Sequence, residues 1–220
     1  NKFSLLPGIF DEGNKIVNSV RSFGKLFITK NFFVIYITLM SLFFLLDFPL
    51  TPRRVSLINI FGIALPAFII TLKNSNVEKT KDFMKDLFSF VIISALIIVS
   101  AGYLGIYFVE KFHNVSQTDI QMVMLTIMVI TNIANYFSIV LTKGDENKLL
   151  YLLYGFMILI LYIFLAATSI NSGIIHLIKL FYEIDFVRPE LWPVIMIISM
   201  VSSFILFMAQ KLRAKFINKI

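Results

Sequence analysis

The sequence predicts an all-α, polytopic membrane protein with six transmembrane helices and a short cytoplasmic stalk. Hydrophobic residues make up 58% of the 220 residues and charged residues 15%, whereas soluble domains average roughly 45–50% apolar and 25% charged residues. The mean hydropathy is +0.86. The charged residues fall into clusters separated by long uncharged runs, which is the pattern of membrane-spanning segments.

Six uncharged runs approach or exceed the roughly 18 to 20 residues that are needed to cross a hydrocarbon core. In chain order, the predicted spans are residues 26–46, 55–72, 87–109, 120–142, 149 to 169–173, and 191–210. Lys30 interrupts the first span. We expect the second helix to begin before its uncharged run, because Thr51 can cap a helix and Pro52 suits the first helical position.

The distribution of basic residues predicts the orientation of these spans. Six spans place both ends of the chain on one side of the membrane. Of the 20 lysines and arginines, 15 fall in segments on the side of the termini and five on the opposite side. The five are Arg53, Arg54, Lys111, Lys179 and Arg188. The positive-inside rule therefore predicts a cell-membrane protein with both termini in the cytoplasm.

Residues 174–187 are predicted to form a helix that does not cross the membrane. His176, Lys179 and Glu183 recur there at i, i+3 and i+7 among apolar residues. This spacing is typical of an amphipathic helix in the membrane interface. We expect it to lie in the outer interface and to end at Arg188-Pro189.

The N-terminal part is predicted to be a stalk that continues into the first span. Residues 14–25 have a helical pattern, whereas residues 6–8 and 11–13 contain proline and glycine and are expected to form turns. We therefore divide the chain into a cytoplasmic remnant with the stalk (1–25), a six-helix transmembrane domain (26–210) and a cytoplasmic tail (211–220).

The composition argues against several kinds of chemistry. The chain has no cysteine, so thiolate zinc sites and cysteine nucleophiles are excluded. The spans have no Asp, Glu or His well inside them, and no glycine-rich phosphate loop occurs. The net charge of +7 is explained by the basic residues that flank the spans, so we do not expect nucleic acid as a partner.

Polar residues within the spans are the candidate functional residues, because they are unfavourable in lipid unless they face the bundle interior. Pro66 has no N–H to donate to the carbonyl of Gly62, and Asn59 lies one turn before that glycine. The freed carbonyl and the amide oxygen could together bind a cation. The alternative is a proline kink that packs against another helix.

Two other spans have polar or small residues at helical spacing. In the fourth span, Thr131, Asn132, Asn135, Ser138 and Thr142 gather on one face. This face is either a polar helix contact or one wall of an ion pathway, and Asn135 is the candidate ligand. In the third span, the spacing of Ser94, Ala101 and Gly105 predicts close helix packing.

Four stretches resemble P-type cation-transporting ATPases, in particular bacterial members related to calcium and magnesium pumps. Residues 11–21 (DEGNKIVNSVR) resemble the junction between the phosphorylation domain and the stalk helix. Leu50-Thr51-Pro52, Leu57-Ile58-Asn59 and residues 64–68 (ALPAF) resemble the hairpin that follows. The resemblance implies that the chain contains the last six of the family's ten membrane helices.

The resemblance implies the membrane part of an ATP-driven pump that works through an aspartyl-phosphate intermediate and requires magnesium. ATP and magnesium would act on the missing cytoplasmic domains, because the aspartate-lysine-threonine-glycine motif is absent from this chain. By the same resemblance, Asn31 and Asn59 match asparagines that help to bind the transported cation.

The identity of the cation stays open among calcium, magnesium and others. The calcium pumps of the family have carboxylates where this chain has Val34 and Ile63. The other partners implied are the lipid bilayer and the missing N-terminal helices and cytoplasmic domains of the same protein. The alternative function is a six-helix permease subunit or a structural membrane protein without its own ATPase.

The predicted topology can be tested with single cysteines, because the chain has none of its own. We expect Asn114→Cys to react with an impermeant thiol reagent in intact cells. Gly144→Cys, in the predicted cytoplasmic loop, should react only after permeabilisation. Labelling of Gly144→Cys in intact cells would contradict the six-span topology.

Overall fold

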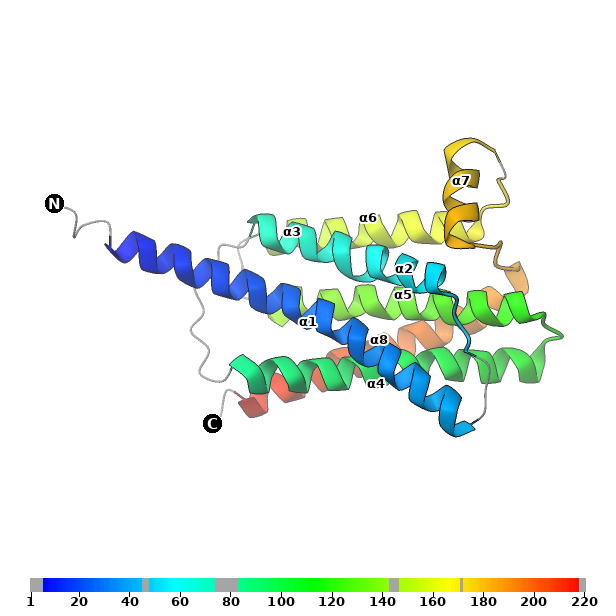
Figure 1. Ribbon diagram of the computed structural model, residues 1–220, viewed down its shortest axis with the longest axis horizontal. Coiled ribbons are helices and arrows are strands. Elements are labelled where there is room, and N and C mark those ends of the chain that lie inside the picture. The colour runs from blue at the N-terminus through cyan, green and yellow to red at the C-terminus, as the bar shows by residue number, and fades with distance from the viewer. Residues whose placement is uncertain (1–5, 45–47, 74–82, 143–146, 171, 218–220) are drawn as a thin grey trace.

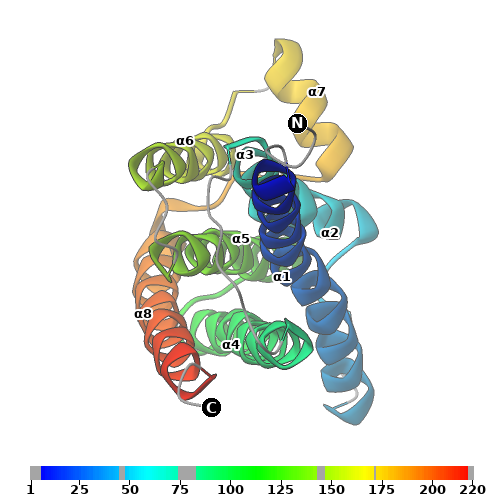
Figure 2. The ribbon, with the colours of Figure 1, turned by 90° about the vertical axis from the view of Figure 1, so that its left-hand side faces the viewer.

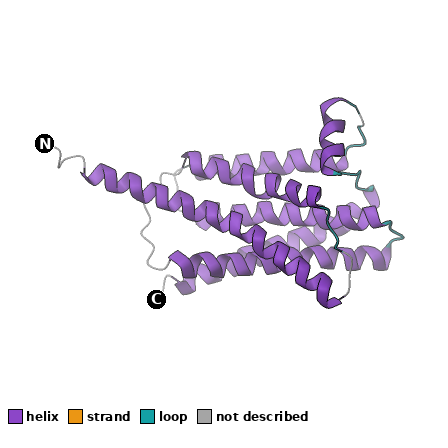
Figure 3. Cartoon of the chain, viewed as in Figure 1, coloured by secondary structure: helices purple, strands orange, loops and turns teal. Residues whose placement is uncertain are grey.

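A computed structural model describes residues 6–44, 48–73, 83–142, 147–170 and 172–217. Within these ranges the chain is helical and contains no strand (Figure 3). The helices, with a π-helical segment (η2) and a short 3-10 segment (η3), are α1 (Leu6–Phe44), α2 (Pro52–Asn59), η2 (Ile60–Ala64), α3 (Leu65–Lys73), α4 (Phe83–Phe112), α5 (Gln117–Thr142), α6 (Lys148–Ala167), α7 (Gly173–Tyr182), η3 (Pro189–Leu191) and α8 (Trp192–Ile217). The all-α fold predicted from the sequence is confirmed.

Within the described ranges, six helices are long and apolar enough to cross a membrane. They are α1, the continuous α2–η2–α3 unit, α4, α5, α6 and η3–α8. Each contains or closely matches one predicted span. The chain is thus a multi-pass membrane protein.

The second span begins where the sequence predicts. Thr51 has an extended backbone, and its hydroxyl accepts a hydrogen bond from the Arg54 N–H, while Pro52 occupies the first helical turn. Thr51 Oγ1 also donates to Glu183 Oε2 at 2.6 Å. This cap therefore fixes both the start of α2 and its contact with the segment after α7.

The transmembrane helices surround α5, which lies at the centre of the bundle (Figure 2). Of its most apolar 18-residue window, 83% is buried within the protein, compared with 22–50% for the other spans. The start of α1 and the end of α8 lie at the same end of the bundle (Figure 1), which we name the terminal end. The opposite end, which includes α7, is named the distal end.

Small residues allow the helices to approach α5 closely. A Cβ placed on Gly105 would lie 2.2 Å from Ile127 Cδ1, and one on Gly155 would lie 2.4 Å from Phe137 Cε1. Ala101 is also buried. The close packing predicted for Ala101 and Gly105 is confirmed, whereas Ser94 has a hydrogen-bonding role described below.

The prediction that residues 6–8 and 11–13 form turns is wrong, because both stretches belong to α1. Proline is tolerated in the first turn of a helix, where its missing N–H would have no intrahelical partner. Each interior glycine costs only about 1 kcal/mol relative to alanine. Gly8 and Gly13 are therefore not enough to interrupt this 39-residue helix.

A helix forms within residues 174–187 as predicted, but it is shorter than predicted, and its place in the outer interface stays a prediction. The helix α7 ends at Tyr182, because Glu183 adopts a left-handed backbone with φ of 55°, and the Ile184 N–H donates to the Lys179 carbonyl at 2.8 Å. Lys179, expected on the polar face, is buried and donates from Nζ to the Thr168 carbonyl at 2.6 Å, beside the end of α6. Burial lowers the pKa of the Lys179 ammonium, and the nearby Asp185 carboxylate opposes that shift.

Other sequence expectations lie outside the described residues. They concern the loop that contains Gly144, residues 1–5 of the stalk region and the last three residues of the tail.

The packing at Gly155 predicts a strong effect of a single methyl group. We expect Gly155→Ala to lower the thermal midpoint of the protein in detergent, with a loss of about 1–3 kcal/mol from overpacking. Gly24→Ala is the control, because its new Cβ would meet only Leu87 Cδ1 at 3.7 Å, an ordinary contact. A midpoint for Gly155→Ala equal to or above that of the control would contradict the close packing of α6 on α5.

Candidate functional site

A short π-helical segment interrupts the second span near its middle. In η2 the backbone bonds shift by one residue, so that the Leu65 N–H donates to the Ile60 carbonyl five residues earlier. Pro66 follows immediately and lies in the first turn of α3. Inside a helix, proline lacks one backbone hydrogen bond, and its ring clashes with the carbonyl four residues earlier. A π segment before the proline reduces this clash, and π segments are frequent at functional sites.

Gly62 in η2 packs directly against Asn132 on α5. A Cβ at position 62 would lie 2.7 Å from the Asn132 Cβ, so a larger residue would require the backbones to separate. Asn132 is fully buried, and its Nδ2 donates to the Met128 carbonyl at 2.9 Å. Its Oδ1 is buried without a hydrogen-bond partner in the described part of the chain.

Asn59 also has a buried Oδ1 for which the described residues provide no hydrogen-bond partner. The α2–η2–α3 unit and α5 both run from the distal end to the terminal end (Figure 1). Since Gly62 is level with Asn132, Asn59 lies about 4.5 Å further toward the distal end, at 1.5 Å per residue. Two unpaired amide oxygens therefore lie within about one helical turn of each other along the bundle axis.

An unpaired buried oxygen is unfavourable, by roughly 1–3 kcal/mol, unless a ligand or water satisfies it. Amide and carbonyl oxygens are ligands that hard cations such as calcium prefer. The contact between η2 and α5 can thus contribute neutral oxygens to a cation. The structure contains no group of three or more His, Cys, Asp or Glu side chains that could hold a metal within the described ranges.

The two other predicted ligands differ from Asn59. Asn135 is buried one turn from Asn132, but its Oδ1 accepts a hydrogen bond from Ser94 Oγ at 2.8 Å, and its Nδ2 is the atom left unpaired. Asn31 is exposed on α1, two residues from the buried Thr29 and Phe33 and hence on the opposite side of the helix. The structure therefore brings Gly62 and Asn132 into contact, with Asn59 nearby, and leaves Asn31 apart.

The sequence analysis selected Asn135 as the candidate ligand on the fourth span, whereas the residue that packs against Gly62 is Asn132. Both residues belong to the polar face of the fourth span. Which of the two faces Gly62 depends on the rotation of α5 about its axis, and no local sequence pattern gives that rotation. The roles of all four predicted ligands stay predictions.

A chain of hydrogen bonds links Asn135 to the terminal end of the bundle. Ser94 accepts from Gln210 Nε2 at 2.8 Å, and the same nitrogen donates to the Phe90 carbonyl at 3.0 Å. Gln210 Oε1 in turn accepts from Arg213 Nε at 2.6 Å. The chain thus connects α5, α4 and α8 through buried polar groups.

Arg213 belongs to a buried ionic cluster centred on Asp86, which we name the Asp86 cluster (Arg21, Lys25, Asp86 and Arg213). Lys25 Nζ lies 2.7 Å from Asp86 Oδ2, Arg21 Nε donates to the same oxygen at 2.7 Å, and Arg213 pairs with Oδ1. The four side chains are only 8–14% exposed. One carboxylate therefore holds three cations from α1 and α8 against α4.

Comparison with known proteins gives one distant similarity to a transporter. The chain is 25% identical over 115 residues to the calcium-transporting ATPase CtpE of Mycolicibacterium smegmatis. The aligned region is 48% of this chain and 14% of that ATPase. No protein-family model and no solved structure matches the chain. Together with the six apolar helices, this similarity supports a transporter-related membrane protein.

We expect the protein to lose much of its stability when the negative charge of Asp86 is removed. Asp86→Asn would leave three buried cations without a counter-charge, so we expect a loss of about 3–5 kcal/mol, measured as a lower thermal midpoint in detergent. Glu12→Gln is the control, since Glu12 pairs with Lys15 in an exposed position and should contribute about 0–1 kcal/mol. Equal midpoints for the two variants would show that Asp86 does not hold α1, α4 and α8 together.

Proposed function

We propose that this chain is the membrane-spanning part of an ATP-driven P-type cation pump and forms part of its ion pathway. The observation that carries the proposal is the pair of unpaired amide oxygens, Asn59 Oδ1 and Asn132 Oδ1, beside the π segment in the middle of the bundle. The distant similarity to a calcium-transporting ATPase supports a cation as the transported species.

The length of α1 supports coupling to a cytoplasmic domain. This helix runs without interruption for 39 residues from the stalk region into the first span. Ile16, Val17 and Val20 on the stalk are each more than half exposed. An apolar surface on the part of a helix that lies outside the membrane suits contact with another part of the same protein.

In this proposal, ATP and magnesium act on cytoplasmic domains that this chain does not include, and both termini are cytoplasmic in the cell membrane. The bias of basic residues toward the terminal end supports that orientation. The two amides carry no charge, so residues outside this contact must supply the remaining ligands and the charge that neutralises the ion. We leave the ion open among calcium, magnesium and others.

Replacement of the two unpaired amides tests the proposed pathway. We expect Asn59→Leu and Asn132→Leu in the full-length protein to raise the half-saturating cation concentration for ATPase activity by roughly five- to 150-fold, since each removes one oxygen ligand at similar side-chain bulk. The measurement is cation-dependent ATP hydrolysis over a panel of ions, after expression has been matched.

Asn114→Leu is the control, because Asn114 lies exposed in the connection between α4 and α5. Asn135→Leu and Asn31→Leu extend the test to the other two predicted ligands. Unchanged half-saturation in both Asn59→Leu and Asn132→Leu, for every ion that stimulates the enzyme, would contradict the proposed site. The η2–α5 contact would then be packing alone.

A further inference from the structure

The helix α7 projects sideways from the distal end of the bundle instead of running along it (Figure 1). Figure 2 shows α6 end-on and α7 side-on, so α7 runs along the membrane surface if α6 crosses the membrane. Gly173, with φ of 63°, and Glu183, with φ of 55°, are the left-handed residues that set its direction. Four large apolar side chains on α7 are more than 60% exposed: Ile174, Leu177, Leu180 and Phe181.

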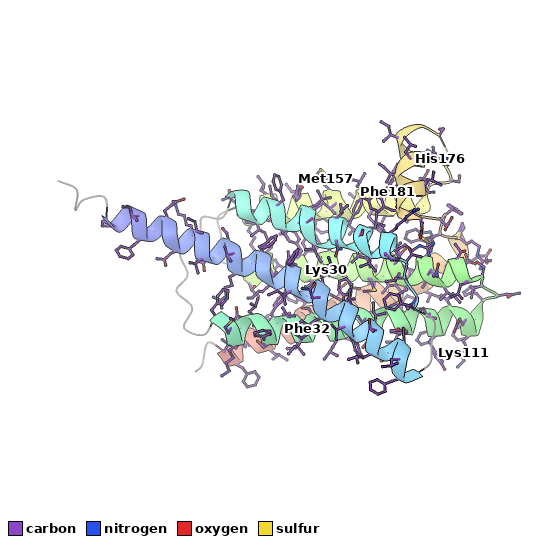
Figure 4. The ribbon with its side chains drawn as sticks, viewed as in Figure 1. Lys30, Phe32, Lys111, Met157, His176 and Phe181 are labelled. Carbon is purple, nitrogen blue, oxygen red and sulfur yellow. The ribbon has the colours of Figure 1, made fainter. Side chains whose placement is uncertain are left out.

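A cavity of about 470 Å³ lies between α7 and the segment that follows it. Its wall combines charged and apolar side chains: His176, Lys179, Glu183, Asp185, Leu180 and Phe186. Figure 4 shows His176 and Phe181 on α7, at the edge of the bundle. A cavity that joins charged groups to an exposed apolar surface, at the level of the membrane interface, suits an amphiphilic ligand.

Three of the charged groups of this cavity, Lys179, Glu183 and Asp185, have hydrogen-bond partners, whereas His176 is exposed. Lys179 uses one of its three N–H donors on the Thr168 carbonyl, so two remain for a ligand. Asp185 accepts from Arg54 Nη2 at 3.2 Å, although its side chain remains 57% exposed. Glu183 is held by Thr51 and by Arg53, 3.4 Å away. The cavity thus offers donors for an anion and acceptors for a cation in the same space.

We propose that this cavity binds the headgroup of a zwitterionic phospholipid with a primary ammonium group. The phosphate would accept hydrogen bonds from Lys179 and His176, and the ammonium would donate to Asp185 and Glu183. The acyl chains would lie along the exposed apolar face of α7. A primary ammonium fits carboxylate acceptors because it carries three N–H donors, which a trimethylated ammonium lacks. This site does not depend on the proposed pump function.

Lipid binding to the delipidated full-length protein tests the site, with native mass spectrometry as the readout. We expect phosphatidylethanolamine to bind roughly tenfold more tightly than phosphatidylcholine or phosphatidylglycerol, because only the first satisfies both sets of charged groups. Soluble glycerophosphoethanolamine, which has the same headgroup without acyl chains, should bind more weakly than the lipid.

Variants connect this preference to the cavity. Lys179→Gln and His176→Gln should each reduce the preference for phosphatidylethanolamine, and Lys111→Gln, at the same end of the bundle on α4, should keep it (Figure 4). Lys179 also caps the end of α6, so Lys179→Gln could fail to fold. His176 is exposed, so the His176→Gln variant then provides the test. Equal binding of the three lipids, or a preference unchanged in His176→Gln, overturns the proposal. If the soluble headgroup binds as tightly as phosphatidylethanolamine, the acyl chains contribute nothing, and the proposal that a lipid occupies the cavity is wrong.

Discussion

The need to pair polar groups within the protein governs this structure, because a hydrocarbon core supplies no water for hydrogen bonds. The hydroxyls of Thr126 and Thr131 donate to carbonyls one turn earlier in α5, and Tyr136 donates to the Tyr151 carbonyl on α6. Such pairing is the rule in the bundle. Among the few buried exceptions in the described part of the chain, Asn59 Oδ1 and Asn132 Oδ1 are the amide oxygens, and this is why they are the best candidates for a site.

The same constraint explains why the fold could be predicted from the sequence to a large extent. Every span must satisfy its own backbone, so a long uncharged run has to be a helix, and the six runs became six helices. The cap at Thr51 was predictable because its hydrogen bond is local. The error at residues 6–13 arose because proline and glycine favour turns but do not prevent a helix, and the error at residues 183–187 arose at the end of α7. A left-handed Glu183 has no clear signal in the sequence.

The candidate site was predictable only in part, because it depends on how helices rotate against one another. Pro66 drew attention to Asn59 and Gly62, and Gly62 does lie in a π segment against α5. The contact between Gly62 and Asn132 could not be inferred from one sequence, since Asn135 belongs to the same polar face. The network that joins Asn135 to Asp86 was also missed, because it depends on Gln210 and Arg213 of α8, which are 116 and 127 residues from their partners Ser94 and Asp86 on α4.

The position of the Asp86 cluster along α1 has a mechanical consequence. Arg21 and Lys25 lie near the middle of this helix, which leaves arms of about 26 Å toward Leu6 and about 32 Å toward Phe44 at 1.5 Å per residue. A rigid rod held near its midpoint acts as a lever with a fulcrum. If the stalk tilted about this point, the membrane arm, which packs into the bundle through Phe33 and Ile37, would be pushed in the opposite direction, and the ionic contacts at the fulcrum would move least.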